Sequence, residues 1–295
     1  MKPIKLFLSL ILLLSIFFSC GQNNQDRKKR IALKDTIQVK SLKESQLERR
    51  EVIDAQERAD SIALAKVLDE ALKIAAENII KNKFKKSYDA IIDSGHVVNV
   101  KVNSDYFFNK NQPHLVIRRT DRSGIFIDVY SKNKNQYERV LTHQEHINTY
   151  LSDTIKDING DGLKDFVVNI YGSTGCCLKA FSSVYLIKPD QQSFSKQIEF
   201  INPTFSPKEK LIRGVCYGHP GETELYKYKW KGEGVDTVEY IYYEKNSKGK
   251  KTGIIISSNV RPHDKGEKFK KRLKRVPKEY RKIEGYDWFT GKGDK

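Results

Sequence analysis

Oxygen-bearing side chains recur at every second position of the stretch DINGDGLKD, in which Gly162 allows a turn. Calcium takes six to eight hard oxygen ligands, and a loop that turns on glycine can direct alternating side chains at one centre. Carboxylates that converged there without a cation would repel one another. We therefore predict a calcium site whose ligands are the side chains of Asp157, Asn159, Asp161 and Asp165 and the main-chain carbonyl of Leu163.

The residues after the loop indicate which kind of calcium loop this is. An EF-hand has a bidentate Glu at its twelfth position, whereas Val168 stands there in this chain, inside the apolar stretch DFVVNIY. The loop should therefore lead into a strand. Its nine residues resemble the calcium loops of FG-GAP and related β-propeller blades, in which an Asp at the ninth position closes the site. The alternative is a metal-free Asx turn between two strands.

The amino terminus has the layout of a secretory signal. Two lysines precede an apolar run over residues 6–18, which is too short to cross a bilayer comfortably. Ser19, Cys20 and the glycine that follows resemble the lipobox of bacterial lipoproteins, in which the cysteine is acylated. We expect removal of residues 1–19, a membrane anchor at Cys20, and a location in the bacterial cell envelope, facing the periplasm or the surface. The alternative is an ordinary cleaved signal in which Cys20 is incidental.

Export would place the other cysteines in an oxidising compartment, where thiols tend to pair. They are Cys176, Cys177 and Cys216. We expect Cys216 to bridge to one of the adjacent pair, since that bond would join two hairpins. Three reduced buried thiols and a strained vicinal disulfide are the alternatives. A zinc site is not supported, because no Cys-x-x-Cys spacing is present.

The formal net charge of +17 is the largest anomaly of composition. In a cytoplasmic protein that charge would suggest nucleic acid as the partner. Export argues against nucleic acid and favours the anionic lipid head groups and cell-wall polymers of an envelope. Because 31% of the 295 residues are charged, part of the chain should be solvated.

Two segments should precede the folded domain. Residues 20–40 are mostly polar without clear periodicity, which is typical of a flexible tether. Residues 41–86 lack Pro and Gly and are rich in Ala, Leu, Glu and Lys, which predicts a helical segment. This helix is either a stalk or coiled coil that spaces the domain from the membrane, or a helix packed on its own β-domain. Its apolar stripe consists of Leu68, Leu72, Ala75 and Ile79.

Residues 87–260 contain short β-branched or aromatic stretches such as HVVNVKV, GIFIDVYS and TVEYIYYEK, separated by turn residues. Because no helical pattern lies between them, these stretches predict a mainly β fold that follows the long amino-terminal helix. The strands should form an antiparallel meander, either a partial propeller or a sandwich-like fold. Alternation in ELYKYKW predicts one aromatic face and one face in water. The aromatic face has Tyr226, Tyr228 and Trp230, and the other has Lys227 and Lys229, with only Leu225 out of pattern.

Residues 261–295 form a basic carboxy-terminal tail. A run of like charges is usually solvated, and we favour that interpretation over a specific anion site. The aromatic cluster around Trp288 should nevertheless dock on another surface, because aromatic side chains are costly to leave in water.

Residues 155–230 resemble a family of small bacterial periplasmic proteins that includes immunity proteins against peptidoglycan-degrading effectors and is related to lysozyme inhibitors. The resemblance implies a calcium-stabilised β-fold that binds another protein, such as a cell-wall hydrolase, without catalysis of its own. Beyond the calcium loop, its features are Tyr185, Phe194, Asn202, Pro203, Phe205, Lys210, Ile212, the Gly218–Gly221 turn, Tyr228 and Trp230.

The exposed glycine turns YGSTG and YGHPG are the candidates for contact with such a partner. The side chains in question are those of Tyr171, Ser173, Tyr217 and His219.

Two other functions compete with this interpretation. Catalysis finds little support, because His143 and His146 are three positions apart while the metalloprotease motif needs four, and neither a nucleophile elbow nor a phosphate loop is present. The main alternative is a structural envelope lipoprotein that binds the cell wall or an anionic surface through its helix and basic tail.

Overall fold

The computed structural model describes residues 22–92, 95–172, 180–262 and 264–292, with side chains from Ser45 onward. The chain divides into two compact units, residues 1–65 and residues 66–295. Among the described residues, no helix is long and apolar enough to cross a membrane.

One long helix, α2, runs from Gln22 to Glu77. Its sequence contains neither Gly nor Pro, which explains why the helix includes the residues expected to form a tether. The helix ends at Glu77, before the predicted end at residue 86. Just after its last residue, the side chain of Asn78 donates a hydrogen bond to the carbonyl of Ile74 (2.9 Å). Residues 84–86, predicted as helix, belong instead to the first strand.

The last turns of α2 pack within the second unit. Val67, Ala71 and Ala75 are buried on one face at spacings of four residues. The carboxylate of Glu70 lies close enough to Tyr88, in the first strand, to add to the effect of burial in raising the pKa of that phenol to about 12. These turns therefore lie against the first sheet, while the helix up to Ala65 belongs to the other unit.

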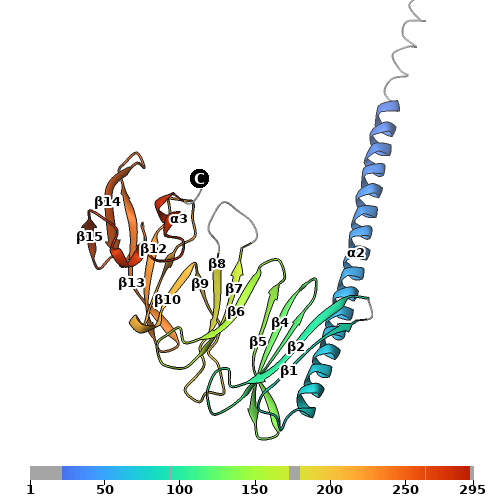
Figure 1. Cartoon of the computed structure of the whole chain (residues 1–295). Helices are drawn as coiled ribbons and strands as arrows, with labels where there is room; N and C mark the ends of the chain where they lie inside the picture. Colours follow the sequence, from blue (N-terminus) through green and yellow to red (C-terminus); the bar gives the residue numbers. More distant parts are fainter. Residues whose placement is uncertain (1–21, 93–94, 173–179, 263, 293–295) are drawn as a thin grey trace, which may run out of the picture. The chain divides into compact units, whose positions relative to one another are not determined.

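The rest of the second unit is mainly β, as predicted, and consists of three antiparallel meanders whose strands pair in chain order (Figure 1). The first sheet contains β1 (Phe84–Ile91), β2 (Val97–Asp105), β3 (His114–Thr120), β4 (Gly124–Asn133) and β5 (Gln136–His146). The second contains β6 (Tyr150–Lys156), β7 (Asp165–Tyr171), β8 (Ala180–Tyr185) and β9 (Ile198–Ile201). The third contains β10 (Pro203–Ser206), β11 (Leu211–Val215), β12 (Leu225–Lys231), β13 (Gly234–Lys245), β14 (Lys251–Ser258) and β15 (Lys270–Leu273).

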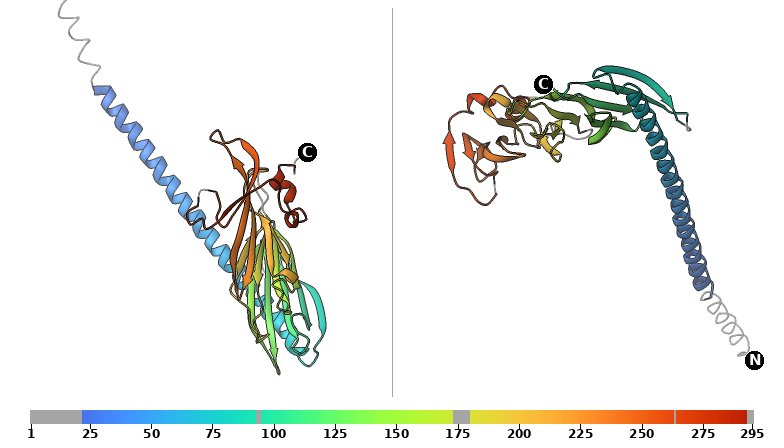
Figure 2. Two further views of the ribbon diagram at one scale, coloured as in Figure 1. Left: turned by 90° about the vertical axis from the view of Figure 1, so that its left-hand side faces the viewer. Right: turned by 90° about the horizontal axis from the view of Figure 1, so that it is seen from below.

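The second sheet is the middle layer between the other two, and Figure 2 shows the three meanders from two further directions. Phe166 and Val168 of β7 pack in one core with residues of β3, β4 and β5. Val167, on the opposite face of the same strand, packs with Ile212 and Tyr226 of the third sheet. Burial on both faces accounts for the run of consecutive apolar residues 166–168 in this strand.

The carboxy-terminal segment covers the outer face of the third sheet. It contains two short helices, η2 (Lys278–Tyr280) and α3 (Tyr286–Thr290). Tyr280 and Phe289 are fully buried there and share a core with Leu225 and Ile241 of the sheet. The aromatic cluster thus packs on the protein's own sheet, and Leu225 is apolar because its face is covered.

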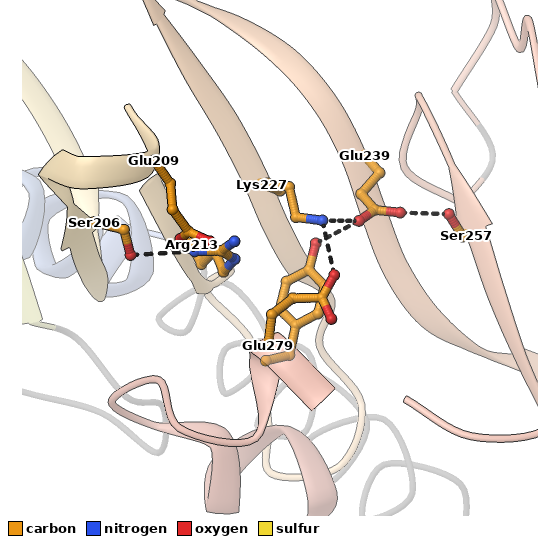
Figure 3. Close-up of polar contacts among 8 residues, drawn as sticks. Ser206, Glu209, Arg213, Lys227, Glu239, Ser257 and Glu279 are labelled. Atoms are coloured by element: carbon orange, nitrogen blue, oxygen red, sulfur yellow. Dashed lines mark hydrogen bonds and ion pairs between the residues drawn. The ribbon is translucent and has the colours of Figure 1, made fainter. Parts of the chain in front are cut away.

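Lys227 does not lie in water, contrary to the sequence prediction. Its ammonium contacts Glu239 and lies 3.3 Å from Glu279 of η2, and only 12% of its side chain is exposed. Glu239 also accepts hydrogen bonds from Ser257 (2.6 Å) and Tyr280 (3.2 Å). Figure 3 shows the contacts that join Lys227 and Glu239 of the sheet to Glu279 of the carboxy-terminal segment. A buried cation is therefore balanced by carboxylates from both layers.

Candidate functional site

The aspartate-rich loop connects β6 to β7, and Lys156 and Asp165 pair across its base. It turns at Gly160 and Gly162, which have φ angles of +75° and +87°. Gly160 also lies against the third sheet's first connection, because a Cβ placed there would come within 2.1 Å of the carbonyl oxygen of Pro207. Glycine is therefore required at residue 160 for both backbone angle and space.

The acidic side chains of the loop fold back onto its own backbone. Asp157 accepts N–H bonds from Gly160 (2.7 Å) and Gly162 (3.0 Å), one at each carboxylate oxygen. Asn159 and Asp161 are joined by two hydrogen bonds, from the backbone N–H of Asp161 (3.0 Å) and from the side-chain amide of Asn159 (2.9 Å). These are the Asx turns that Asp and Asn form readily.

Asp165 is fully buried at the start of β7. Its carboxylate accepts the N–H of Ile158 in the loop and the N–H of Ile187 beyond β8, both at 3.1 Å. Burial raises its pKa to about 7, the two N–H bonds oppose that rise, and the charges of Asp161 and Asp157 add to it. Asp165, the ligand predicted at the ninth position of the loop, thus links three segments of backbone. Its carboxylate is also close enough to Asp157 and Asp161 to feel their charges.

This donor set fits calcium by its chemistry. It offers three carboxylates and one amide, and a carboxylate oxygen that accepts one N–H retains a second lone pair. Within the described residues, however, no group of three or more His, Cys, Asp or Glu side chains is arranged to hold a metal ion. The loop is closed by its own hydrogen bonds, and the calcium site stays a prediction that a binding measurement must test.

Trp230 fastens the loop to the third sheet. Its indole N–H donates to the carbonyl of Ile158 (3.2 Å), and its backbone N–H donates to the carbonyl of Lys210 (3.1 Å). A cavity of about 390 Å³ beside the loop is lined by Asn159, Asp161 and Trp230, among others. The loop is therefore a junction of the second and third sheets, which favours a structural role for any ion bound there.

Tyr171, where the first candidate contact turn begins, lies at the opposite end of β7 from this loop. Tyr171 ends the strand and is exposed, about 20 Å from Asp165 at the rise of a β-strand. Tyr171 pairs with Ala180, and the N–H of Ala180 donates to the side chain of Asn202 (2.7 Å). Asn202 in turn donates to the carbonyl of Val215 (3.0 Å), just before the second turn. A single buried asparagine thus brings the ends of both turns together.

The second turn is held by the carboxy-terminal segment. Trp288 donates its indole N–H to the carbonyl of Gly218 (2.9 Å), and the N–H of Gly221 donates to the carbonyl of Trp288 (2.8 Å). Tyr217 and His219 are exposed on this turn, with 52% of Tyr217 accessible. Ser173, the remaining candidate, lies outside the described residues.

Among the cysteines, only Cys216 is described, and its thiol is free and buried. Burial raises its pKa to about 12. Cys20, Cys176 and Cys177 lie outside the described residues. Ala180, the first residue of β8, is tied through Asn202 to Val215, so β8 begins at the sheet end at which Cys216 lies. The disulfide stays a prediction.

The two histidines of THQEHINTY have different surroundings. His143 is buried, and its Nδ1 lies 2.8 Å from the hydroxyl of Tyr185. His146 accepts the N–H of Asn148 (3.2 Å) in the turn after β5. Because they stand three positions apart on one strand, they point to opposite faces.

No family model, curated protein or solved structure matches this chain. The resemblance to periplasmic immunity proteins and lysozyme inhibitors therefore depends on the motifs of residues 155–230 alone.

Sequence reasoning missed two residues of this region. Gly160 is distinguished from its neighbour Gly162 only by the approach of Pro207, which comes from a different sheet connection. Asn202 has a positive φ of 46° and is buried. The resemblance included Asn202 as part of a motif, and an Asn before Pro is a turn signal, but neither indicates its contacts with Ala180 and Val215.

Proposed function

We propose that this chain is an envelope lipoprotein, anchored at Cys20, whose β-domain binds another protein and inhibits a peptidoglycan hydrolase. The partner contacts the turns that begin after Tyr171 and at Tyr217, and the aspartate-rich loop holds a structural calcium ion at the opposite end of the sheets. The proposal assigns no catalytic residue to the chain.

One observation carries the proposal: Tyr171 and Tyr217 are exposed at the same end of adjacent sheets, and the backbone beside each of them is fixed by hydrogen bonds. Asn202 links the bases of both turns, and Trp288 braces the second one. A turn that is held in place before binding loses little conformational entropy when a partner docks. Exposed tyrosine supplies contact area with few rotatable bonds.

The contacts of the aspartate-rich loop support a stabilising role for the loop and a binding role for the opposite end of the sheets. All of its described hydrogen bonds are internal to the loop or link it to neighbouring backbone, and Trp230 closes its outer side. Stability at one end of the sheets and recognition at the other are therefore separable by mutation.

The test is inhibition of purified peptidoglycan hydrolases by the full-length protein in nonionic detergent. We expect one class among muramidase, amidase and endopeptidase to be inhibited at a one-to-one ratio. Tyr217→Ala combined with His219→Ala should weaken inhibition at least tenfold while the variant remains folded, as judged by a cooperative melting transition. Ile80→Ala, which removes an exposed apolar side chain outside the sheets, is the control and should inhibit normally. The proposal would be contradicted if the protein inhibited none of the three classes, or if the double variant inhibited as strongly as the wild type.

A further inference from the structure

A second surface, separate from the loop and the turns, concentrates positive charge. We define the basic strap as residues 265–278, which include eight lysines and arginines and one glutamate. Its net charge of +7 compares with +17 for the whole chain. The cations are Lys265, Lys268, Lys270, Lys271, Arg272, Lys274, Arg275 and Lys278, and all are exposed.

The strap is an ordered, extended row. Its centre is β15, the edge strand of the third sheet, which pairs with β14 from Ser258↔Lys270 to Ile255↔Leu273. The side chain of Asn259 accepts the N–H groups of Lys268 (2.8 Å) and Phe269 (3.3 Å) at one end. Val276 is buried in the sheet's outer core at the other end. The charges are therefore held in line by the backbone.

Most of this charge has no protein counterpart. Arg272 pairs with Glu244 (2.8 Å) and Lys270 with Glu267 (3.5 Å). Within the part of the chain that the structure describes, the other six cations of the strap form no ion pair. Lys227 of the same sheet is neutralised by two carboxylates. The strap differs in that six exposed cations, unpaired among the described residues, lie close together in the sequence.

The chemistry of the strap indicates the kind of partner. Six of its eight cations are lysines, which act as hydrated point charges and suit a diffuse anion better than a planar, bidentate one. Exposed charges carried along a segment with an edge strand at its centre suit a linear polymer with repeating anionic groups better than a compact anion. Phe269 is its one exposed large apolar side chain among the described residues, which offers little area for insertion into a bilayer.

We propose that the basic strap binds a linear anionic glycan polymer. The predicted export signal favours an envelope glycan over nucleic acid, and the strap and the contact turns would engage different partners. This inference stands whether or not the domain inhibits a hydrolase, because no strap residue belongs to the loop or the turns.

Heparin, an anionic glycan, is the probe, and its affinity for the full-length protein in nonionic detergent is measured across a salt series. The test variant combines Lys268→Gln, Lys271→Gln and Lys274→Gln, which removes three unpaired charges. The control combines Lys85→Gln, Lys86→Gln and Lys101→Gln, three exposed lysines of the first sheet that also lack ion pairs among the described residues. Both variants change the net charge equally and should keep the wild-type melting temperature.

We expect the strap variant to bind heparin at least tenfold more weakly at moderate salt, and the slope of log affinity against log salt to fall by about 2 to 3. The control should bind like the wild type. If both variants lost heparin affinity equally, only the net charge of the protein would matter. If the strap variant bound heparin like the wild type, the strap would not be the binding site. Duplex DNA and phosphatidylglycerol mixed micelles are compared with free heparin as competitors, at equal concentrations of negative charge. If either displaces the protein from heparin more effectively than free heparin does, the glycan assignment is wrong.

Discussion

The indole of Trp230 donates a hydrogen bond to the backbone carbonyl of Ile158 across a separation of 72 residues. Ile158 is fully buried in the aspartate-rich loop, and its own N–H donates to Asp165. One loop residue therefore connects the second sheet to the third.

Replacing Gly160 with alanine should destabilise the protein far more than the same change at Gly162. Both glycines have positive φ, which costs an alanine about 1 to 2 kcal/mol. Only at residue 160 would the new Cβ also collide with the carbonyl of Pro207. Urea unfolding of the two variants measures the difference, and equal losses would refute the close contact between the loop and the third sheet.

Lys227→Met should lower the free energy of unfolding by roughly 3 kcal/mol, because it leaves Glu239 without its cation under the carboxy-terminal segment. Lys229→Met is the matched control, since that lysine is exposed on the same strand two positions later. Chemical denaturation compares the two. If Lys227→Met proved as stable as the control, the carboxy-terminal segment would not cover this face in solution.

The contribution of His143 to stability should fall as the pH drops below about 6.5, the ordinary pKa of histidine, whereas the raised pKa of Asp165 acts in the opposite direction. Burial lowers the pKa of His143 in the folded state, although Glu145 and Asp153 oppose the shift. At this histidine the unfolded chain therefore binds more protons in this range, and the stabilising contribution of neutral His143 is lost as the pH falls through its folded pKa. His143→Gln should remove this contribution, so that the melting temperature falls less, or rises more, between pH 7 and pH 5. An unchanged pH dependence in that variant would assign the effect to other groups.

A disulfide from Cys216 to Cys176 or Cys177 should appear in non-reducing peptide maps of protein purified from an envelope. Cys216→Ser should then lower stability by roughly 2 to 4 kcal/mol under oxidising conditions. The same substitution in reduced protein is the control and should cost much less. Recovery of three alkylatable thiols from the oxidised protein would rule the bond out.

Several features of the fold could be predicted from local pattern. The stretch DFVVNIY follows an aspartate-rich turn and has an apolar run at residues 166–168, and it forms strand β7 of the middle sheet with both faces of that run covered. The short stretches between turn residues form meanders, because neighbouring strands joined by tight turns pair with each other. Tyr226 and Trp230 face a core as their alternation indicates.

Other features depend on residues distant in the chain and carry no local signal. Alternation in β12 places Lys227 on the face opposite the aromatic residues, but whether that face meets water depends on a segment some 50 residues later. The sequence predicts residues 84–86 as helix because they continue a helical composition, and the pairing of β1 with β2 overrides that preference.

The candidate site shows the same limit. Spacing and residue type identified the acidic side chains of the loop, and the Asx turns among them are local. The closure of the loop by Ile187 and Trp230 is not local, and neither is the joining of the two contact turns by Asn202. Such contacts form only when the sheets stack.

The most direct test of the central claim is calorimetric titration of calcium into metal-stripped protein, with melting curves recorded before and after addition. We expect one calcium ion per chain and a higher melting temperature, since binding to the folded state alone stabilises it by about 2.7 kcal/mol at a hundredfold excess over Kd. Asp161→Ala should lose both responses, while Asp190→Ala, at an exposed acidic turn outside the loop, should keep them. Absence of calcium binding by the wild type, together with a melting curve indifferent to calcium, would contradict the account and leave the loop as a metal-free junction of Asx turns.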